Sequence, residues 1–404
     1  MSINMSRLGG GVAVGALLAL GLSATAQAQE TKTTWGGAPR LTNDSLTFKV
    51  RGRVYEDVVF QEVDRAVGAD FSASSTRLRT ARIGVEGTYS SNWAYKVEVN
   101  FPGRGETYEW EDIMLEYKPT DTSSIILGNF KTVSLENLTS SRYITFMERG
   151  PYNDVLDIGR VATAAVKFNG MNWTLSAAGT GNSVNSTDPA AGDERRGLNV
   201  RGTFAPIDTD TTKLHLGAWA RKRSRGDEGG FNYQARNNTN FGARYISTGA
   251  IGDEDTTIAL EGALVHKSFS VQAEWANVES DRIGAGTDPD VKTWYAFASW
   301  FPTGEMRRYE SKTGEFNRNK ILNPTTAGGW GALELAVRYD SVELGGLPTV
   351  ATAGDYKAWT VGANWYPIPY VRFMANYSKA ENDNRLTAND VDVDTLQFRA
   401  QFDW

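Results

Sequence analysis

The sequence contains no cysteine, only 12 prolines and only two histidines in 404 residues. Without cysteine there are no disulfides, so in an oxidising compartment the chain would have to gain its stability in another way, for example from an extensive hydrogen-bonded sheet. A zinc site would need a cluster of histidines or thiolates, and His215 and His266 are separated in the chain. A Ser–His hydrolase also needs a base beside its nucleophile, and no GxxxxGK phosphate loop is present. We therefore expect neither an enzyme nor a cofactor or metal centre.

Long apolar segments are also missing from residues 29–404, where no run of about 18 uncharged apolar residues could form a membrane helix. The first residues differ. Arg7 precedes an apolar run over residues 12–22, and the small-x-small pattern Ala26-Gln27-Ala28 follows. This run is too short to span a bilayer and is typical of a secretory signal peptide, with a buried helix as the alternative. We expect residues 1–28 to be removed on export, so that the mature chain begins near Gln29.

The composition of the remaining chain suits a sheet. The sequence has 41 glycines and 45 aromatic residues, and its mean hydropathy is −0.41. These values are typical of many short strands joined by polar loops. Beyond residue 28 there are 41 basic and 48 acidic side chains, a formal net charge of −7. The overall charge thus gives no indication of nucleic acid as a partner, and any preference for anions must come from the local placement of basic residues.

Apolar residues alternate with polar ones in many segments of about ten residues. Between residues 93 and 101, for example, Trp93, Val97 and Phe101 share one face, while Lys96 and Glu98 share the other. This period of two predicts strands. A soluble sandwich would alternate as well, but these segments reach the 9 to 11 residues that cross a bilayer at a tilt, and aromatic residues gather at their ends. The pattern therefore favours a transmembrane barrel.

Sixteen such segments can be counted. They lie at residues 46–56, 80–90, 93–101, 109–118, 124–131, 160–169, 173–181, 196–205, 213–223, 256–266, 268–278, 291–301, 331–342, 356–366, 369–379 and 394–404. An even number lets an antiparallel sheet close without an edge, and sixteen strands leave a water-filled lumen. We therefore predict an all-β fold, a 16-stranded antiparallel transmembrane β-barrel over residues 46–404, preceded by an N-terminal segment at 29–45.

The connections alternate between short and long ones. Short connections are expected on the periplasmic side and long ones on the exterior; the long ones are 57–79, 131–159, 224–255 and 380–393. Residues 241–246 resemble a seventeenth strand, which we assign to the loop 224–255. The connection 302–330 is long, although it lies on the side where short turns are expected. Either the strand count is off there, or this segment folds into the barrel or binds periplasmic partners.

Charged residues with the parity opposite to the apolar ones should face the lumen, because a charge at the lipid-facing midplane costs about 2–4 kcal/mol. We expect this basic pore lining to contain Lys49, Arg51, Arg53, Arg82, Arg201, Arg221, Arg223 and Arg338. Acidic residues, among them Glu86 and Glu98, share the parity. The alternative for any single arginine is a solvated wall position paired with an acidic neighbour on the next strand. A row of guanidinium groups could instead offer successive weak sites to anions.

The loop 131–159 is rich in apolar residues, which is unusual for a loop in water. We expect it to fold inward against the barrel wall as the third extracellular loop, and to narrow the channel with Arg142, Glu148 and Arg149. The alternatives are a lid on the outer rim or a trimer contact.

Several stretches of this loop resemble the phosphate-selective porin O and P family. They are Leu127-Gly128-Asn129-Phe130-Lys131, Ser134-Leu135-Glu136, Leu138-Thr139-Ser140-Ser141-Arg142 and Thr145-Phe146-Met147-Glu148-Arg149, with further similarity in 79–100, 300–305, 330–339 and 364–367. The resemblance covers nearly all of the chain beyond the signal peptide. It implies a sixteen-stranded outer-membrane porin, commonly trimeric, with an inward third loop and basic residues along an anion pathway.

From the resemblance we expect a porin of a Gram-negative outer membrane that lets small hydrophilic solutes diffuse passively, with anions such as phosphate preferred. The expected surroundings are outer-membrane lipid, lipopolysaccharide and two further copies of the chain. The alternatives are a non-specific or weakly cation-selective porin, and a structural or adhesive barrel with a plugged lumen. The acidic runs 252–255 and 389–394 could bind calcium weakly, although solvated loops are the commoner explanation for such runs.

Overall fold

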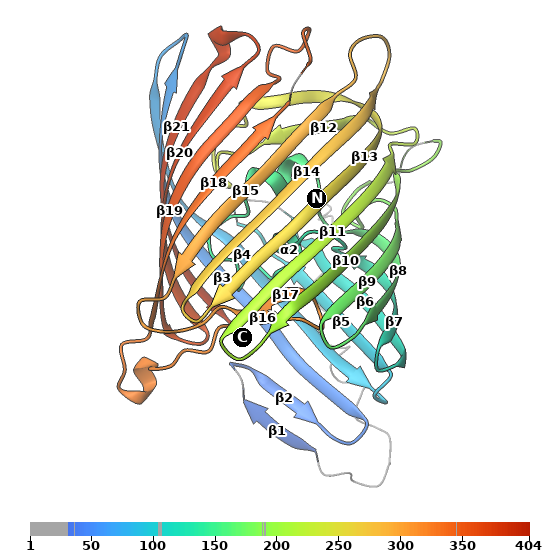
Figure 1. The fold of residues 1–404 in the computed structure, drawn as a ribbon, viewed down its shortest axis with the longest axis vertical. Coiled ribbons are helices and arrows are strands. Elements are labelled where there is room, and N and C mark those ends of the chain that lie inside the picture. Colours follow the sequence, from blue (N-terminus) through green and yellow to red (C-terminus); the bar gives the residue numbers. More distant parts are fainter. Residues whose placement is uncertain (1–30, 36, 104–106, 188, 190, 345) are drawn as a thin grey trace, which may run out of the picture.

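The computed structural model describes residues 31–404 except 36, 104–106, 188, 190 and 345. The expected signal peptide at 1–28 therefore lies outside the described residues. In the described part of the chain nineteen strands join one antiparallel sheet, and sixteen of them form a closed barrel (Figure 1). Among the same residues, no helix is long and apolar enough to cross a membrane. The prediction of a 16-stranded barrel is confirmed.

The barrel strands differ in length, and so the barrel has tall and short walls. They are β3 (Leu46–Arg65), β4 (Phe71–Tyr89), β5 (Trp93–Asn100), β6 (Glu109–Thr120), β7 (Ser123–Phe130), β8 (Val161–Asn169), β9 (Trp173–Thr180), β10 (Arg196–Asp208), β11 (Thr212–Ser224), β13 (Ile246–His266), β14 (Phe269–Arg282), β15 (Asp290–Trp300), β18 (Ala332–Glu343), β19 (Gly354–Ile368), β20 (Val371–Asn384) and β21 (Val391–Asp403). Three short strands extend the sheet: β1 (Lys32–Trp35), β2 (Pro39–Thr42) and β12 (Phe231–Ala235). The longest barrel strands are β3, β4 and β13, and the shortest are β5, β7, β8 and β9.

Each predicted strand overlaps one barrel strand, and most of the differences lie at the outer ends. Strand β3 continues to Arg65, and β13 begins at Ile246 where the sequence predicted residue 256. The outward positions near the end of β3 are Glu62 and Asp64, which are charged and exposed. The apolar alternation ends where the membrane ends, but the backbone pairing continues above it, so the sequence pattern underestimates the strands.

The barrel closes between its last and first strands. Asp403 of β21 lies opposite Arg53 of β3, and Val391 lies opposite Arg65. The row Leu396, Phe398 and Phe402 is exposed on the outside, and Gln397, Arg399, Gln401 and Asp403 are buried inside. Trp404 extends the seam, because its backbone N–H and C=O pair with Gly52 at 3.0 and 3.1 Å.

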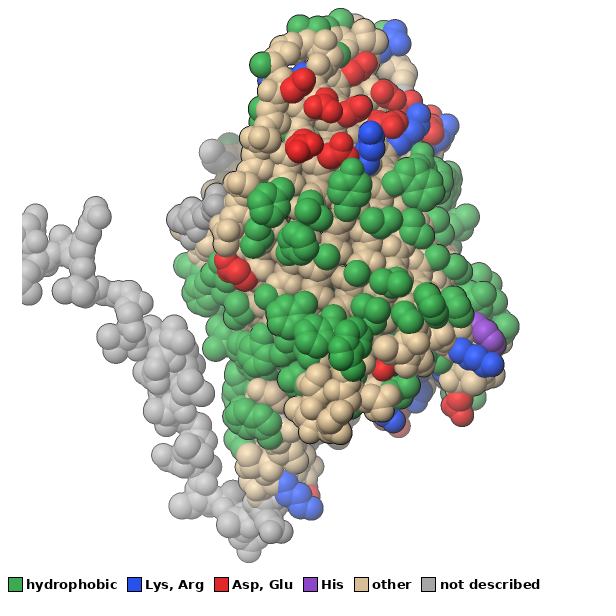
Figure 2. Space-filling view, turned by 90° about the vertical axis from the view of Figure 1, so that its left-hand side faces the viewer, with side chains coloured by type: hydrophobic (Ala, Val, Ile, Leu, Met, Phe, Trp, Pro, Cys, Tyr) green, Lys and Arg blue, Asp and Glu red, His purple; other side chains and the backbone are tan. Residues whose placement is uncertain are grey.

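The outer surface of the barrel separates into bands. Figure 2 shows a belt of hydrophobic side chains around the middle and acidic side chains gathered above it, near the outer ends of the strands. Members of the belt such as Leu260, Val361 and Phe398 are 43–55% exposed. A lipid-facing apolar belt beneath a charged rim is the arrangement expected of a transmembrane barrel.

Much of the lumen is filled by an apolar core. The loop 131–160 carries two short helices, α2 (Leu135–Leu138) and α3 (Pro151–Val155), and folds inward as predicted (Figure 1). Phe146 and Tyr152 of this loop are buried, and they stack edge-on against Phe297 and Tyr295 of β15 at ring distances of 5.6 Å. The loop is thus packed against the wall as an element of the barrel interior.

A second exterior loop also enters the lumen, which the sequence did not indicate. Residues 241–245 form no strand, and the loop that contains them reaches the far wall. There Asn238 donates to Asp340 at 2.9 Å and accepts from Arg338 at 2.9 Å, and its carbonyl accepts from Gln397 at 3.1 Å. Loop 224–255 is therefore partly an interior segment.

The segment 302–330 folds into the barrel from the periplasmic side, which was one of the three explanations left open above. It forms the hairpin β16 (Arg308–Glu310) and β17 (Glu315–Asn317), followed by the turn η1 (Thr325–Ala327). The backbone N–H of Phe316 donates to Thr139 Oγ1 at 3.3 Å, and the carbonyl of Gly314 accepts from Arg201 at 3.0 Å. This hairpin supports the inward loop from below. One further turn, η2 (Thr387–Asn389), precedes β21.

Closure at Trp404 generates a prediction for Gly52. A Cβ at Gly52 would overlap the Trp404 indole, whereas a Cβ at Gly262, on the outer face of β13, would meet nothing within 4 Å. We expect Gly52→Ala to displace the indole and to destabilise the folded barrel by about 1–3 kcal/mol, the usual cost of overpacking. Urea unfolding in lipid vesicles, followed by tryptophan fluorescence, measures the change. Gly262→Ala is the matched control, and equal midpoints for the two variants would contradict the role given to the seam.

Candidate functional site: a basic constriction in the lumen

Two cavities run through the part of the lumen that the loops leave open. The outer cavity, of about 600 Å³, includes Arg195, Arg236 and Arg244 in its lining, and the inner cavity, of about 300 Å³, includes Arg82 and Arg201. Three residues line both: Lys131, Asn137 and Arg149. A solute that passes directly from one cavity to the other passes these three side chains, which we call the junction.

The local sequence explains how the junction is built. Strand β7 ends at Phe130, so Lys131 is the first residue of the inward loop, and its Nζ donates to the carbonyl of Asn137 at 3.2 Å. Ser134 caps α2 by accepting from the N–H of Asn137 at 3.3 Å. The two N–H groups at the start of α2, on Leu135 and Glu136, donate to Glu274 of β14 at 3.0 and 2.7 Å. The wall thus fixes α2, and α2 fixes the junction.

Arg149 closes the other side of the junction. Its Nε and Nη2 donate to the carbonyls of Glu136, Asn137 and Thr139 at 2.6–3.2 Å. Within the described residues, neither Arg149 nor Lys131 forms an ion pair. Burial, together with repulsion from Arg149 and Arg160, lowers the pKa of the Lys131 ammonium well below its ordinary value. Within the described residues Arg149 thus remains without an ion pair, and an anion bound beside Lys131 would favour the charged form of its amine.

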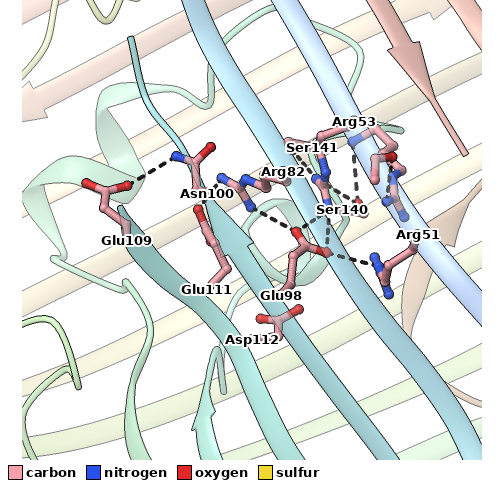
Figure 3. Close-up of polar contacts among 12 residues, drawn as sticks. Arg51, Arg53, Arg82, Glu98, Asn100, Glu109, Glu111, Asp112, Ser140 and Ser141 are labelled. Atoms are coloured by element: carbon pink, nitrogen blue, oxygen red, sulfur yellow. Dashed lines mark hydrogen bonds and ion pairs between the residues drawn. The ribbon is translucent and has the colours of Figure 1, made fainter. Parts of the chain in front are cut away.

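The wall beside the junction carries a network of paired charges (Figure 3). Glu98 of β5 is fully buried. It accepts from Arg53 at 2.9 Å and from Arg82 at 3.5 Å, and it forms an ion pair with Arg51 at 2.9 Å. Arg53 also reaches across to the inward loop, where it donates to Ser141 at 2.6 Å. Such charge-assisted bonds compensate for the cost of removing the groups from water. The network keeps the arginine ladder of β3 and β4 in place.

The charges that line the cavities are predominantly basic. Around the inner cavity there are eight basic residues and two acidic ones: Arg53, Arg82, Lys96, Lys131, Arg149, Arg160, Lys167 and Arg201 against Asp112 and Glu315. The outer cavity has six basic and four acidic residues: Arg79, Lys131, Arg149, Arg195, Arg236 and Arg244 against Glu109, Glu148, Asp154 and Asp157. A cleft with this excess raises the local concentration of anions. The excess is larger on the inner side.

The three residues expected at the constriction take different positions. Arg149 lines both cavities. Glu148 lines the outer one, where Arg79 at 2.8 Å and Arg399 at 2.7 Å pair with it and hold its pKa far below the ordinary value. Arg142 lines neither; it is buried against the wall, donates to the carbonyl of Gly52 at 3.0 Å and lies 3.7 Å from Asp403. Arg142 thus anchors the loop near the barrel seam.

The predicted pore-lining residues all face the interior, but they have different surroundings. Arg53, Arg82 and Arg201 line the inner cavity, and Arg221 and Arg223 line a third cavity of about 170 Å³ beside it. Lys49 and Arg51 pair with Glu86, outside these cavities. Arg338 is buried under the Phe146 ring and bonds Asp340 at 2.9 Å. The alternation along a strand therefore identifies which side chains face inward. It does not show which of these side chains line a cavity where a solute could reach them.

Sequence reasoning missed several cavity residues. Lys167 follows the alternation of β8, so parity could have found it. Lys131 stands in one of the stretches that resemble the porin family, which was a second signal. Arg236 and Arg244 lie in a loop without periodicity, where no pattern indicates an inward position. Residues that loops bring into the lumen are thus the ones that the sequence does not reveal.

The two histidines lie on neighbouring strands but on opposite faces of the wall. His215 is buried inside, with Nδ1 2.6 Å from the Tyr309 hydroxyl and Nε2 3.1 Å from Glu261, whereas His266 contacts Thr212 at 2.9 Å on an exposed turn. Within the described ranges, no group of three or more His, Asp or Glu side chains is arranged to bind a metal ion. Asp253 and Asp255 of the acidic run 252–255 pair with Arg225 and Arg223.

Comparison with known proteins identifies the fold and the family. A curated protein of Caulobacter vibrioides without an assigned function is 30% identical over 86% of this chain and 71% of its own length. Porin O of Pseudomonas aeruginosa is 27% identical over 94% of this chain and 95% of its own length. The in-vitro folded trimer form of OmpT, an outer-membrane protein of Vibrio cholerae, superposes with a TM-score of 0.55 at 12% identity, covering 89% of this chain and 100% of OmpT. The model of the family "Phosphate-selective porin O and P" matches residues 48–404, and the chain belongs to this family of outer-membrane porins.

Proposed function

We propose that this porin carries small hydrophilic anions, phosphate among them, and that the anions pass between Lys131 and Arg149. The observation that carries the proposal is the junction itself: both side chains line both cavities, and neither forms an ion pair within the described residues. An anion that enters the junction would meet two basic side chains that form no ion pair within the described residues, and its charge would favour the ammonium form of Lys131. The family description, which names phosphate, supports the same class of solute.

The free donors at the junction suit an oxyanion. Lys131 donates one of its three N–H groups to the carbonyl of Asn137. Arg149 donates from Nε and Nη2 to backbone carbonyls. Nη1 of Arg149 forms no hydrogen bond within the described part of the chain. A phosphate or carboxylate oxygen can accept from these remaining donors, and charge-assisted bonds of this kind are short and strong.

Release of the anion needs weaker sites on both sides of the junction. Arg236 on the outer side and Arg201 on the inner side are both paired with carboxylates, at 3.1 Å from Asp154 and 2.7 Å from Glu261. Such paired arginines attract an anion less than the junction does. A sequence of weak, strong and weak sites permits entry and release, as conduction requires.

The rival function is a non-specific or weakly cation-selective porin, and the carboxylates of the wall would be its basis. Glu98, Glu111 and Asp112 face the lumen, but each is paired with at least two basic groups. A carboxylate that is held by two cations has little charge left for a passing cation. The geometry therefore favours the anion pathway.

We also propose that the chain works as a homotrimer in contact with outer-membrane lipid and lipopolysaccharide. Support comes from OmpT, which has the same barrel fold and is described in a trimer form. The apolar belt provides the surface for lipid, and the charged band above it lies where lipopolysaccharide headgroups would be (Figure 2).

The junction predicts that phosphate blocks the current of smaller anions. In planar bilayers we expect stepwise, chloride-over-potassium selective conductance that millimolar phosphate reduces. Lys131→Gln should weaken the block roughly tenfold or more, because a hydrogen bond to a charged group contributes about 1.5–3 kcal/mol. Arg149→Gln should act in the same direction. The concentration of phosphate that halves the chloride current is the quantity to compare.

Two controls make this experiment specific. Arg142→Gln, which changes a buried arginine outside both cavities, should leave the block within about twofold, and Lys267→Gln at the periplasmic turn should not change it. Cation preference of the unaltered channel would refute the anion pathway. An unchanged block in Lys131→Gln would refute the role of the junction.

The outer cavity predicts a dependence on pH. Burial raises the pKa of Asp154 in α3 to about 6, against the opposing effect of Arg236 and Arg244. Above this pH Asp154 is charged; as the pH falls through about 6 it takes up a proton, and the cavity gains one positive charge. The chloride-over-potassium permeability ratio should then rise roughly fivefold, since a unit charge about 8 Å away in water changes an ion's energy by about 0.5 kcal/mol, with opposite sign for the anion and the cation. Reversal potentials between pH 7.5 and 5 measure the ratio.

Asp154→Asn should show the higher ratio at both pH values. Asp253→Asn, which removes an exposed carboxylate outside the cavity, should keep the pH dependence of the unaltered channel. A pH dependence that persists in Asp154→Asn would assign the titration to another group.

A further inference from the structure

The hydrophobic belt contains one carboxylate that lipid cannot accommodate well, Glu56 of β3. Its side chain has the outward parity and is exposed. Its neighbours on that face are apolar: Val54 and Val58 along the strand, Ala400 opposite on β21 and Leu78 opposite on β4. Within the described residues Glu56 has neither a hydrogen bond nor an ion pair. Ionisable residues at the level of a membrane are costly and as a rule have a partner.

Glu56 is too far from the headgroups to reach them. The charged band begins on this strand at Glu62, six residues further on, which is about 20 Å along a strand and about 15 Å in height at the usual tilt. A glutamate side chain spans only a small part of that distance. In the other direction, the outward positions from Val54 down to Leu46 carry no charged side chain. Glu56 therefore lies well inside the belt.

The adjoining wall is also poorly suited to lipid. Strands β5, β7 and β9 have eight residues each, fewer than the about 9–11 that a strand needs to cross a bilayer at a tilt, and β8 has nine, the minimum of that range. The outer face of this wall is apolar, with Leu127, Val166 and Leu175 more than 40% exposed. It also presents hydrogen-bond donors at Trp110 and Tyr117, both more than a third exposed.

We propose that the outer face from β21 through β3 to β9 is the contact surface for a second copy of this chain, and that Glu56 accepts a hydrogen bond from that copy. The inference rests on the homotrimer proposed above and adds the face that mediates it. In a ring, one part of the face meets a different part on the next copy, so the Glu56 region can meet the short wall with its indole and phenol donors. The contact removes both problems at once: the carboxylate gains a donor, and the short strands are covered by protein.

The natural absence of cysteine permits a direct test with single-cysteine variants of the full-length chain. Val54→Cys places a fluorophore beside Glu56 and keeps the carboxylate. Val361→Cys places the same fluorophore on the outer face of β19, where Val361 is 52% exposed. In vesicles of brominated phospholipid we expect strong quenching at residue 361 and at least threefold weaker quenching at residue 54. Equal quenching of the two labels in a protein of trimer mass would overturn the proposed face while leaving the trimer in place.

Charge changes at residue 56 give a second, independent readout. Glu56→Gln retains an acceptor oxygen and should keep the trimer mass measured by light scattering in detergent, whereas Glu56→Lys can only donate and should shift the mass to that of a monomer. Val361→Lys is the matched control, and it should remain a trimer. A trimeric Glu56→Lys variant would overturn the role of Glu56, and a monomeric unaltered protein would overturn both the trimer and the face. If Glu56→Lys fails to fold, the quenching comparison decides.

Discussion

The closure of the sheet between β21 and β3 is the constraint on which the rest of the structure depends. In hydrocarbon each backbone N–H and C=O group must be paired within the chain, and an open edge would leave a whole row of them unpaired. Closure also divides the side chains into two populations, since successive residues point to opposite faces. On β21, for example, Leu396 and Phe398 face outward, whereas Arg399 and Asp403 face inward. Most charged groups at membrane level are thus collected in one narrow space.

Charges collected in this way need partners, and many of the arginines find them on the backbone of the inward loop. Arg372 donates to the carbonyl of Ile144 at 2.7 Å, and Arg221 donates to that of Leu156 at 2.6 Å. A carbonyl satisfies the donor without cancelling its charge. The same bonds therefore fix the loop and keep the lumen positive, although the chain beyond residue 28 has a net charge of −7. Many of the compensating acidic residues, such as Glu62 and Asp64, lie outside on the rim.

The fold was predictable because a membrane makes the alternation strict, and each of the sixteen predicted segments overlaps a barrel strand. The outer ends of the strands were not predictable, because above the membrane both faces of a strand such as β3 can be polar and the alternation disappears. The inward loop was predictable from its apolar content, which is a property of composition. The junction was only half predictable: Arg149 stands in a conspicuous motif, but whether it or Arg142 meets the solute depends on how the loop turns near Gly52. Alternation carries no information about that turn, nor about the loop that brings Arg236 inward.

The position of the pore connects the interior to the outer face. The apolar core of the lumen packs against Tyr295 on β15 and Tyr356 on β19, on the tall side of the barrel, so the cavities run along the side that carries Arg53 and Arg82. Strand β3 therefore has two roles within a few residues: Arg51 and Arg53 face the network around Glu98 on the inside, and Glu56 faces outward. A contact with a second copy at Glu56 would stiffen the wall that positions the arginine ladder. Selectivity and assembly would then depend on the same strand, because the short wall is both the boundary of the pore and the part of the barrel that lipid covers least well.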